Sequence, residues 1–464
     1  MGSLSDAQAG AATGPFEGAP RKGSPCGYHD KRHPRIRAGD WAALWTSLQE
    51  DLQPSGVETR SAKKARGNNP EARDAAVRRA QVALSEGSPG KALQQLLSPG
   101  IHDVREPAVW EALRKLHPQG VPLDTTQVPA SVEPDLGDTD ISAFWEPLVR
   151  EAIFSFPRST APGPSGLRAS HLQDSVRRPG RGAPLVAALA RLSHMWAHGL
   201  IPEDMGPALC GANLTPLRKK DGAVRPIAVG DILRRLVGKA ILSTAVAKEE
   251  VSSLTPDQVG VGVPRAVETV GIGFATLLEH FGPHSNSWAM AQIDVASAFQ
   301  EVSRLCVLQG AQRDTPSLYN FLRLAYTRTA PLYASGRTLY SESGVHQGCP
   351  LGPVAFSVAI QDLIRHITAQ MGLIWNIWYL DDGLLVGSPE QISQALCYLE
   401  QELLKRGLRL NRAKSNLWGP AAPLVTGSDG MKIIPWQPDS GGNHPWEPSP
   451  FPWVHRLCGG RLET

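Results

Sequence analysis

Two adjacent carboxylates, Asp381 and Asp382, lie between two apolar stretches of the chain. Residues 373–378 precede them, and Gly383 and the apolar residues 384–386 follow. Apolar runs on both sides of such a turn predict a β-hairpin with the acids at its tip. Carboxylate oxygens held on rigid strands suit a hard cation such as Mg²⁺. An Asp-Gly turn is also a common connection between two strands. The motif alone is therefore equally consistent with a surface hairpin that binds no metal.

A third acid, Asp294, follows another short apolar segment upstream. A helical pattern that includes Phe299 begins directly after it, which places Asp294 at the end of a strand. Between the acids, residues 344–353 form a Gly- and Pro-rich turn that opens an apolar helix over 354–367. Glycine lets the backbone approach a ligand closely, and a helix N-terminus favours negative charge.

The order of these motifs resembles the reverse transcriptase domain of non-LTR retrotransposons. The blocks that carry the resemblance are Ser159–Leu167, Leu214–Ile227, Asp294–Phe299, His346–Leu351, Tyr379–Asp382 and Gly407–Lys414. The first two look like the block that opens the domain and its fingers hairpin. The other four are similar to polymerase motifs A, B, C (the YxDD box) and D. Together they span about residues 159–418, a little over half of the chain.

The resemblance implies an RNA-directed DNA polymerase, in which a primer 3′-hydroxyl attacks the α-phosphate of a nucleotide. Two metal ions, Mg²⁺ or Mn²⁺, stabilise the entering and leaving oxygens of such a transfer. We expect Asp294, Asp381 and Asp382 to be the metal-binding and catalytic acids, the alternative for each being a solvated turn aspartate. The implied partners are an RNA template, a DNA primer and dNTPs.

The resemblance also implies residues that contact substrates. These are Arg218, Lys219, Lys220, Arg225, Phe299, Gln347, Gly348 and Tyr379. Cations on a hairpin suit a triphosphate, because arginine offers a bidentate fork and lysine a point charge. A solvated basic hairpin is the alternative. By family analogy Lys414 donates a proton to the leaving pyrophosphate, unless it is only an exposed cation near a helix end.

Two of these residues have a specific alternative. An aromatic side chain at the position of Phe299 would crowd the sugar 2′ position and favour deoxynucleotides, whereas a plain core phenylalanine is the competing interpretation. Gln347 would lie near the template or the incoming base, and a polar loop residue is its alternative. The family often has Asp after the Gln-Gly pair, where this chain has Cys349.

Composition sets broad limits. The 464 residues allow two or three domains, and a net charge of only +3 means that a basic surface must come from local bias. Residues 218–239 have that bias, which would make nucleic-acid binding salt-dependent. Six scattered cysteines without a CxxC pair imply neither a disulfide framework nor structural zinc, and favour an intracellular compartment. No stretch has the length of a membrane span or the pattern of a signal peptide.

The expected fold is α+β: the fingers and palm of a right-hand polymerase, with an antiparallel sheet backed by helices and no recognisable thumb. The expected divisions are a disordered leader at 1–40, a small helical basic region at 41–121, a linker at 122–140, fingers at 141–285, a palm at 286–420 and an irregular truncated tail at 421–464. Because a thumb is not recognisable, two functions stay open. One is an active RNA-directed DNA polymerase, and the other is an inactive retroelement remnant that only binds nucleic acid.

Overall fold

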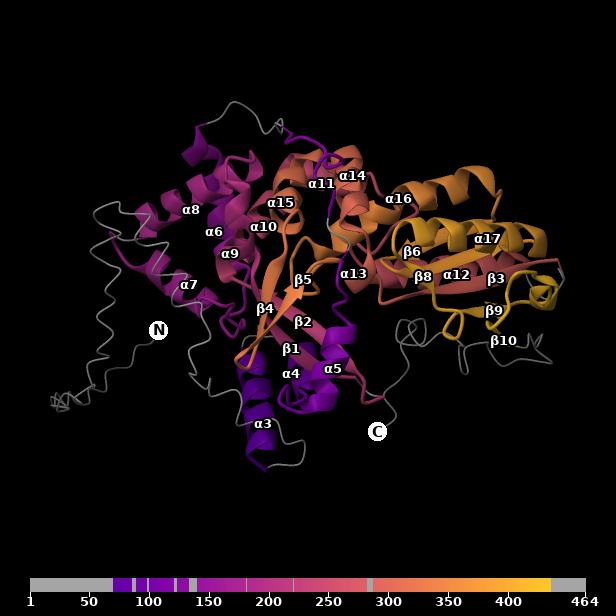
Figure 1. The fold of residues 1–464 in the computed structure, drawn as a ribbon, viewed down its shortest axis with the longest axis horizontal. Coiled ribbons are helices and arrows are strands. Elements are labelled where there is room, and N and C mark those ends of the chain that lie inside the picture. Colours follow the sequence, from indigo (N-terminus) through magenta and orange to yellow (C-terminus); the bar gives the residue numbers. More distant parts are fainter. Residues whose placement is uncertain are drawn as a thin grey trace, which may run out of the picture. The chain divides into compact units, whose positions relative to one another are not determined.

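The computed structural model describes residues 70–85, 89–97, 100–120, 123–132, 140–180, 182–219, 221–281 and 287–434 (Figure 1). These residues belong to one compact unit, which begins at Glu58. The predicted leader at 1–40 lies outside the described residues. Lys220 and residues 435–464 of the predicted tail lie outside them as well.

Two β-sheets, each covered by helices, make up the α+β fold predicted from the sequence (Figure 1). The first sheet has the strand order β2-β1-β4-β5, and the second has the order β10-β9-β3-β7-β6, with β8 paired to β3. The strands are β1 (Ala212–Arg218), β2 (Val224–Gly230), β3 (Ala289–Ala296), β4 (Ala330–Ala334), β5 (Arg337–Ser341), β6 (Trp375–Tyr379), β7 (Asp382–Gly387), β8 (Arg409–Leu410), β9 (Asn416–Trp418) and β10 (Lys432–Ile434). Neighbouring strands are antiparallel except for the pairs β1–β4 and β9–β10.

The helices precede, separate and follow these strands. They are α3 (Pro70–Ser85), α4 (Pro89–Leu97), α5 (Pro107–Lys115), α6 (Ile141–Phe154), α7 (Ala169–Arg177), α8 (Gly182–Ala197), α9 (Gly206–Cys210), α10 (Ile232–Leu242), α11 (Ala245–Ser252), α12 (Ala266–Phe281), α13 (Ala298–Glu301), α14 (Arg304–Asp314), α15 (Pro316–Tyr326), α16 (Gly352–Gln370) and α17 (Pro389–Lys405). Short 3₁₀ turns occur at Glu203–Met205 and Ala422–Leu424.

Local sequence signals explain several helix starts. The Asp140 side chain accepts a hydrogen bond from Ser142 N at the start of α6. Ser388 and Gln391 form a reciprocal capping box at the start of α17. Each cap satisfies backbone N–H groups that have no partner inside the helix. The α17 cap lies directly after β7, so it fixes where the strand that carries Asp382 ends.

The second sheet is buried on both faces, which explains why most residues of β3 and β7 are apolar. Met290 and Leu384 pack with residues of α12 on one face. Ala291, Ile293 and Leu385 belong to the main core on the other face, where α16 and α17 cover the sheet (Figure 1). A sheet packed on both faces is a rigid support for side chains at its strand ends.

The hairpin of β4 and β5 is the main departure from the expected division at residue 285. It follows that boundary in sequence, yet β4 pairs with β1, so the hairpin extends the first sheet and not the second. Residues 232–252 form two helices, α10 and α11, because Thr244 caps the second helix through the Ala247 amide. A single sequence boundary therefore does not separate the two sheets.

Two expected irregular segments contain ordered contacts. Residues 123–132 of the predicted linker pack along α15, where the Tyr319 hydroxyl donates to Pro129 O and Val132 N donates to Asn320 Oδ1 at 3.2 Å. Residues 421–434 of the predicted tail include β10, which pairs in parallel with β9 at the edge of the second sheet.

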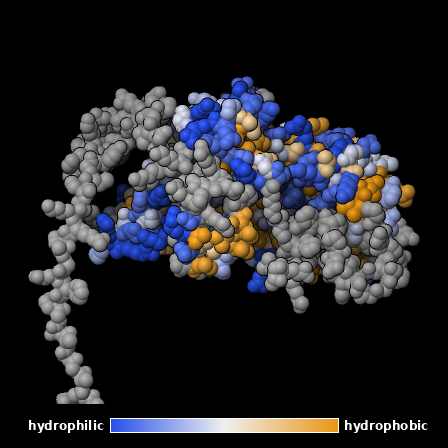
Figure 2. Space-filling view, turned by 90° about the horizontal axis from the view of Figure 1, so that it is seen from below, coloured by the Kyte–Doolittle hydropathy of each residue, from blue (hydrophilic) through white to orange (hydrophobic). Residues whose placement is uncertain are grey.

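Helices α3 and α4 carry much exposed apolar surface. Between them they bury Ala80 and Ala92. The apolar side chains that stay at least 41% exposed on these helices and just after them are Val77, Leu84, Leu93, Leu96, Leu97 and Ile101. Figure 2 shows hydrophobic patches, in orange, within a mostly hydrophilic face of the molecule. None of the helices described here has the length and apolar character needed to cross a bilayer.

Candidate functional site

The Asp381–Asp382 pair lies at the tip of a hairpin, as the sequence predicts. Tyr379 at the end of β6 is opposite Asp382 at the start of β7, so Leu380 and Asp381 form a two-residue loop. Leu380 has a φ of +58°, a backbone conformation that tight hairpin loops require and that bulky residues rarely adopt. The loop therefore turns sharply and leaves Asp381 outside the strand ladder.

Asp294 lies directly opposite Asp382 in the antiparallel pair of β3 and β7. Side chains at such positions share one face of the sheet, with Cβ atoms roughly 4.5–5.5 Å apart. The structure thus brings together the three acids that the sequence singled out, two by strand register and Asp381 by the turn between strands.

The carboxylates influence one another. Burial raises the pKa of Asp381, and the charge of Asp294 raises it further, while Arg225 acts in the opposite direction. Burial, followed by the charges of Asp381 and Asp294, raises the pKa of Asp382 to about 7. Holding partly buried acids that repel one another close together costs folding free energy, and a bound cation would offset that cost.

Asn411 and Ser415 brace Asp294. Asn411 Nδ2 donates to Asp294 Oδ1 at 2.7 Å, and Asn411 N donates to Asp294 O at 2.8 Å. Asp294 N in turn donates to Ser415 Oγ at 3.1 Å. Asn411 stands inside the motif D block, but no feature of the sequence assigned it this contact. Lys414 lies in the same turn with an exposed side chain.

The loop at 344–350 packs closely against β2 and α13. A Cβ at Gly348 would lie 2.3 Å from Ala228 O of β2, and a Cβ at Gly344 would lie 2.3 Å from Phe299 O of α13. Glycine is thus needed at both positions for packing. Gln347 lies between them, and its Oε1 is buried with no hydrogen-bond partner among the described residues. An unsatisfied buried acceptor of this kind is available to a donor from a ligand.

Phe299 and Tyr379 have different surroundings. The ring of Phe299 stacks on Phe356 of α16, with centroids 5.1 Å apart and planes at 14°. That contact supports the interpretation of Phe299 as a core residue. It leaves open that the ring also limits space at the sugar 2′ position, because the side chain is only partly buried. Tyr379 is 37% exposed beside the acids, where it is accessible to a substrate.

The basic hairpin of β1 and β2 presents its cations on different faces. Arg225 pairs with Leu217, and Arg218 pairs with Val224, so alternation puts the two arginines on opposite faces of the sheet. The Val224 face packs against α5. Arg225 influences the pKa of Asp381, which places it within electrostatic reach of the acids. Lys219 lies in the turn, where its backbone amide donates to Ala223 O.

The three acids supply the type of oxygen donor that a divalent cation prefers. Within the described ranges, no group of three or more Asp, Glu, His or Cys side chains is placed to hold a metal ion by itself. Mg²⁺, however, commonly takes one or two protein carboxylates and fills its shell with water and phosphate oxygens. Asp294 and Asp382, with Asp381 beside them, supply carboxylate oxygens of the hard type that this ion prefers.

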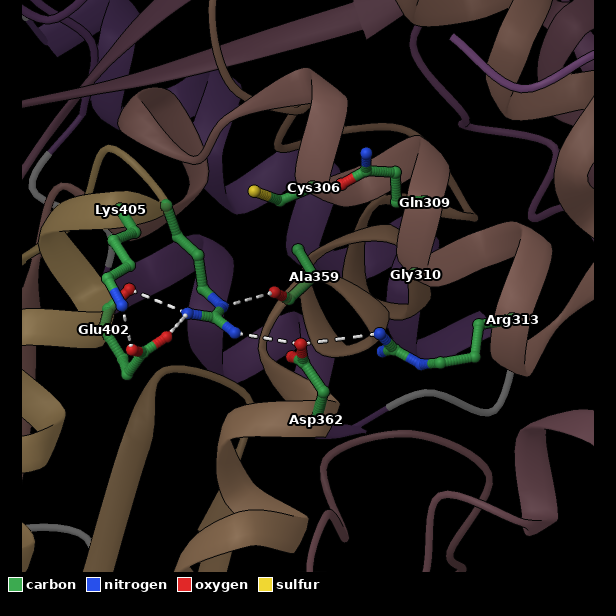
Figure 3. A pocket seen from close by; sticks show the side chains of 9 residues that line it. Cys306, Gln309, Gly310, Arg313, Ala359, Asp362, Glu402 and Lys405 are labelled. Carbon is green, nitrogen blue, oxygen red and sulfur yellow. Dashed lines mark hydrogen bonds and ion pairs between the residues drawn. The ribbon is translucent and has the colours of Figure 1, made fainter. Parts of the chain in front are cut away.

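A separate cavity of about 220 Å³ lies between α14, α16 and α17, on the helical side of the second sheet (Figure 3). Its cations are already paired with acids. Arg406 contacts Asp362 at 2.9 Å and Glu402 at 2.7 Å, and Lys405 contacts Glu402 at 2.6 Å. Because these charges largely neutralise one another, the cavity has no clear preference for an anion or a cation.

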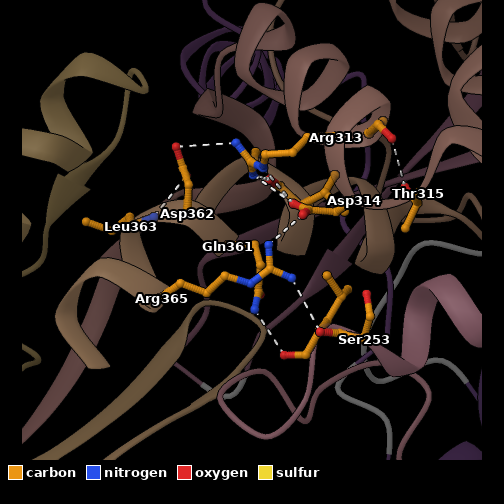
Figure 4. Close-up of polar contacts among 12 residues, drawn as sticks. Ser253, Arg313, Asp314, Thr315, Gln361, Asp362, Leu363 and Arg365 are labelled. Atoms are coloured by element: carbon orange, nitrogen blue, oxygen red, sulfur yellow. Dashed lines mark hydrogen bonds and ion pairs between the residues drawn. The ribbon is translucent and has the colours of Figure 1, made fainter. Parts of the chain in front are cut away.

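The ion pairs continue from this cavity toward α15 (Figure 4). Asp314 has a side chain only 4% exposed and contacts Arg313 at 2.7 Å and Arg365 at 2.6 Å. Breaking one partner of a buried pair leaves an uncompensated charge. This network therefore holds α14 and α16 together behind the sheet, and we assign it a structural role.

Comparisons with known proteins address the family to which this part of the chain belongs. Residues 217–433 match the profile of the family described as reverse transcriptase (RNA-dependent DNA polymerase). The chain is 24% identical over 286 residues to the retrotransposable element SLACS 132 kDa protein of Trypanosoma brucei gambiense, an alignment that covers 60% of this chain and 23% of that protein. The chain therefore spans about a quarter of the length of this curated relative.

Two solved telomerase structures overlap part of the fold. The structure of apo telomerase from Candida tropicalis, truncated from the C-terminal domain, matches 45% of this chain and 50% of its own, with 13% identity and a TM-score of 0.34. Telomerase from Candida albicans, in complex with a fragment of telomeric RNA, matches 46% and 44%, with 13% identity and a TM-score of 0.36. At these TM-scores the overlap does not bear on function.

The matched interval runs from the end of β1 to β10 and includes Asp294, Asp381 and Asp382. The profile, the retrotransposon relative and the sequence blocks thus agree. Residues 217–433 form a reverse transcriptase domain of the non-LTR retrotransposon type.

Proposed function

We propose that this domain is an RNA-directed DNA polymerase that adds dNTPs to a primer 3′-hydroxyl on an RNA template. The observation that carries the proposal is the position of Asp294 opposite Asp382 across β3 and β7, with Asp381 at the adjoining tip. Such an arrangement of carboxylates suits transfer of a nucleotidyl group and has no evident structural purpose, since buried like charges oppose folding.

Asp294, Asp381 and Asp382 would bind Mg²⁺ or Mn²⁺. When bound, such ions stabilise the attacking and leaving oxygens of an in-line displacement. The primer 3′-hydroxyl loses its proton to solvent, the bond from its oxygen to the α-phosphorus forms, the bond from the α-phosphorus to the bridging oxygen breaks, and pyrophosphate leaves. Asn411 Nδ2 donates to Asp294 Oδ1 at 2.7 Å, a contact that would orient this acid before the substrate arrives.

Other side chains would orient the substrates. Arg225 lies on the sheet face within electrostatic reach of Asp381, and it would bind the triphosphate. Gln347 would use its unpartnered Oε1 to contact a base or sugar donor. Phe299 would limit space at the sugar 2′ position, and Tyr379 would contact the primer or nucleotide. Lys414 would supply a proton to pyrophosphate.

The substrate class is tested by single-nucleotide extension with the full chain. A primer annealed to RNA and the same primer annealed to DNA are each supplied with dNTPs or rNTPs and Mg²⁺ or Mn²⁺. The proposal predicts metal-dependent extension on primed RNA with dNTPs. Extension with rNTPs but not with dNTPs would replace it by an RNA polymerase.

A nucleic-acid-binding function without catalysis is the competing interpretation. It predicts that the folded protein retains primed RNA on a filter or in a gel but extends no primer with any nucleotide. It also predicts that Asp294→Asn leaves RNA affinity unchanged. The raised pKa of Asp382 speaks for the polymerase, because a protein that only bound RNA would gain nothing from a repelling acid cluster.

A further inference from the structure

A buried glutamine outside the acid cluster contacts the hairpin that carries Asp381. Gln258 lies in the loop after α11 and is fully buried. Its Oε1 accepts a hydrogen bond from Leu380 N at 2.8 Å, and its Nε2 donates to Leu380 O at 3.2 Å. One side chain thus occupies both backbone polar groups of the residue that directly precedes Asp381.

The backbone on either side of Gln258 strengthens this contact. Trp378 N donates to Asp257 O at 2.6 Å, and Val259 N donates to Trp378 O at 2.8 Å. Gln258 therefore forms an isolated parallel β-bridge with Trp378 of β6. Because these hydrogen bonds fix the backbone of residues 257–259 against β6, the position of the Gln258 side chain beside the turn is also fixed.

Gly260 completes the arrangement. Its backbone N–H donates to Gln258 Oε1 at 3.0 Å, so this oxygen accepts two amide protons and the orientation of the side-chain amide is defined. A Cβ at Gly260 would lie 2.5 Å from Leu380 N. Only glycine allows the loop to approach the turn this closely.

Leu380 requires such external support. Its φ of +58° is unfavourable for a bulky residue and persists only where the surroundings fix it. Asp294 and Asp382 are placed by the register of β3 and β7, whereas Asp381 stands in the loop and has no place in that ladder. The direction of the Asp381 carboxylate therefore depends on the conformation of Leu380.

We propose that Gln258 is a positioning residue that holds Leu380 in its left-handed conformation and thereby aims Asp381 at the divalent cation. The catalytic consequence rests on the proposed function, whereas the conformational consequence does not. Gln258 itself is fully buried and contacts the backbone of the turn, so it acts through Asp381 and not on the substrate.

The test compares Gln258→Met with a matched control, Gln173→Met. Gln173 is also buried, at 2% exposure, and its Nε2 donates to Ile153 O and Phe156 O among the helices. Hydrogen–deuterium exchange is followed for the peptide covering residues 373–387. We expect exchange there to become about tenfold faster in Gln258→Met and to stay as in wild type in Gln173→Met, because Leu380 loses its hydrogen bonds to the Gln258 side chain and the turn opens more often.

The second readout is the Mn²⁺ concentration that gives half-maximal primer extension. We expect about a tenfold rise in Gln258→Met and no change in Gln173→Met, since a misplaced ligand weakens metal binding while a general loss of stability does not. Unchanged exchange in Gln258→Met, or an equal change at residues 373–387 in the control, overturns the proposal.

Failure of the two proposals gives different results. A wild-type protein that extends no primer contradicts the proposed function, yet the exchange comparison still decides the role of Gln258. If Gln258→Met does not fold, Gly260→Ala tests the same contact from the other side, because the added Cβ would press on Leu380 N. Faster exchange of residues 373–387 in Gly260→Ala supports the proposal, and wild-type exchange overturns it.

Discussion

Asn411 Nδ2 lies 2.7 Å from Asp294 Oδ1, and the Asn411 amide also donates to the Asp294 carbonyl at 2.8 Å. Two hydrogen bonds from one residue thus fix both the backbone and the side chain of the acid on β3. The bond from Asn411 Nδ2 orients a carboxylate whose neighbours repel it, and a preorganised ligand needs no rearrangement when the substrate arrives.

Asn411→Leu should lower kcat for primer extension about tenfold, with a smaller effect on the affinity for primed RNA, because Asp294 loses its orientation but keeps its charge. Steady-state extension assays and RNA titration measure both. Asn416→Leu is the matched control, since Asn416 Nδ2 contacts Gln292 Oε1 at 3.1 Å and not the acids. An equal loss of kcat in both variants would show that Asn411 matters only for folding.

Asp382→Asn should stabilise the metal-free protein, and more at pH 8 than at pH 5. The pKa of Asp382 is raised from 3.8 to about 7, so its contribution to stability is complete below about pH 4 and is lost as the pH rises through 7. Removing the charge should raise the free energy of unfolding by about 2 kcal/mol at pH 8, after a discount for partial exposure to solvent.

Chemical denaturation at the two pH values, without divalent ions, measures this difference. Glu268→Gln, on the exposed surface of α12, is the control for removal of an acid outside the cluster. Destabilisation of the metal-free Asp382→Asn protein at pH 8 would mean that the acids do not repel one another.

Arg225→Ala should raise KM for dNTP about tenfold, because it removes a cation on the sheet face within electrostatic reach of the acids. Arg218→Ala should raise it by less, since Arg218 lies on the opposite face of the same hairpin. Extension at graded dNTP concentrations measures both values. Equal effects would contradict this division of the hairpin into two faces.

Phe299→Val should increase the use of rNTPs relative to dNTPs about tenfold if the ring limits space at the sugar 2′ position. Phe356→Leu removes the ring that Phe299 stacks on and serves as the control for lost packing. Single-nucleotide competition on primed RNA gives the ratio for each. Unchanged selection in Phe299→Val, together with a lowered Tm, would leave Phe299 as a core residue.

The sequence predicted the local elements well because local signals define them. Apolar runs on both sides of Asp381 and Asp382 were sufficient for the β6–β7 hairpin, and the strand before Asp294 followed from the same kind of pattern. The family resemblance supplied the order of the blocks. It therefore identified the acids without knowledge of which strands pair.

Local sequence patterns could not predict which distant segments pair in the fold. The register that sets Asp294 opposite Asp382 depends on the packing of both faces of β3 and β7, and no local pattern specifies it. The pairing of β4 with β1 likewise joins distant segments. Gln258 gave no signal, because its role arises from a loop that folds back on the turn before Asp381.

The central claim is that Asp294, Asp381 and Asp382 form the catalytic centre of a polymerase. The most direct measurement is single-nucleotide extension of a primer on RNA, with Mg²⁺ and dNTP, by wild type, Asp294→Asn and Glu301→Gln. Glu301 lies seven residues further along and is paired with Arg409, so its variant controls for loss of a nearby acid. The account predicts extension by wild type and Glu301→Gln, and a loss of at least about 10³-fold in Asp294→Asn. Extension by Asp294→Asn at the wild-type rate would contradict it.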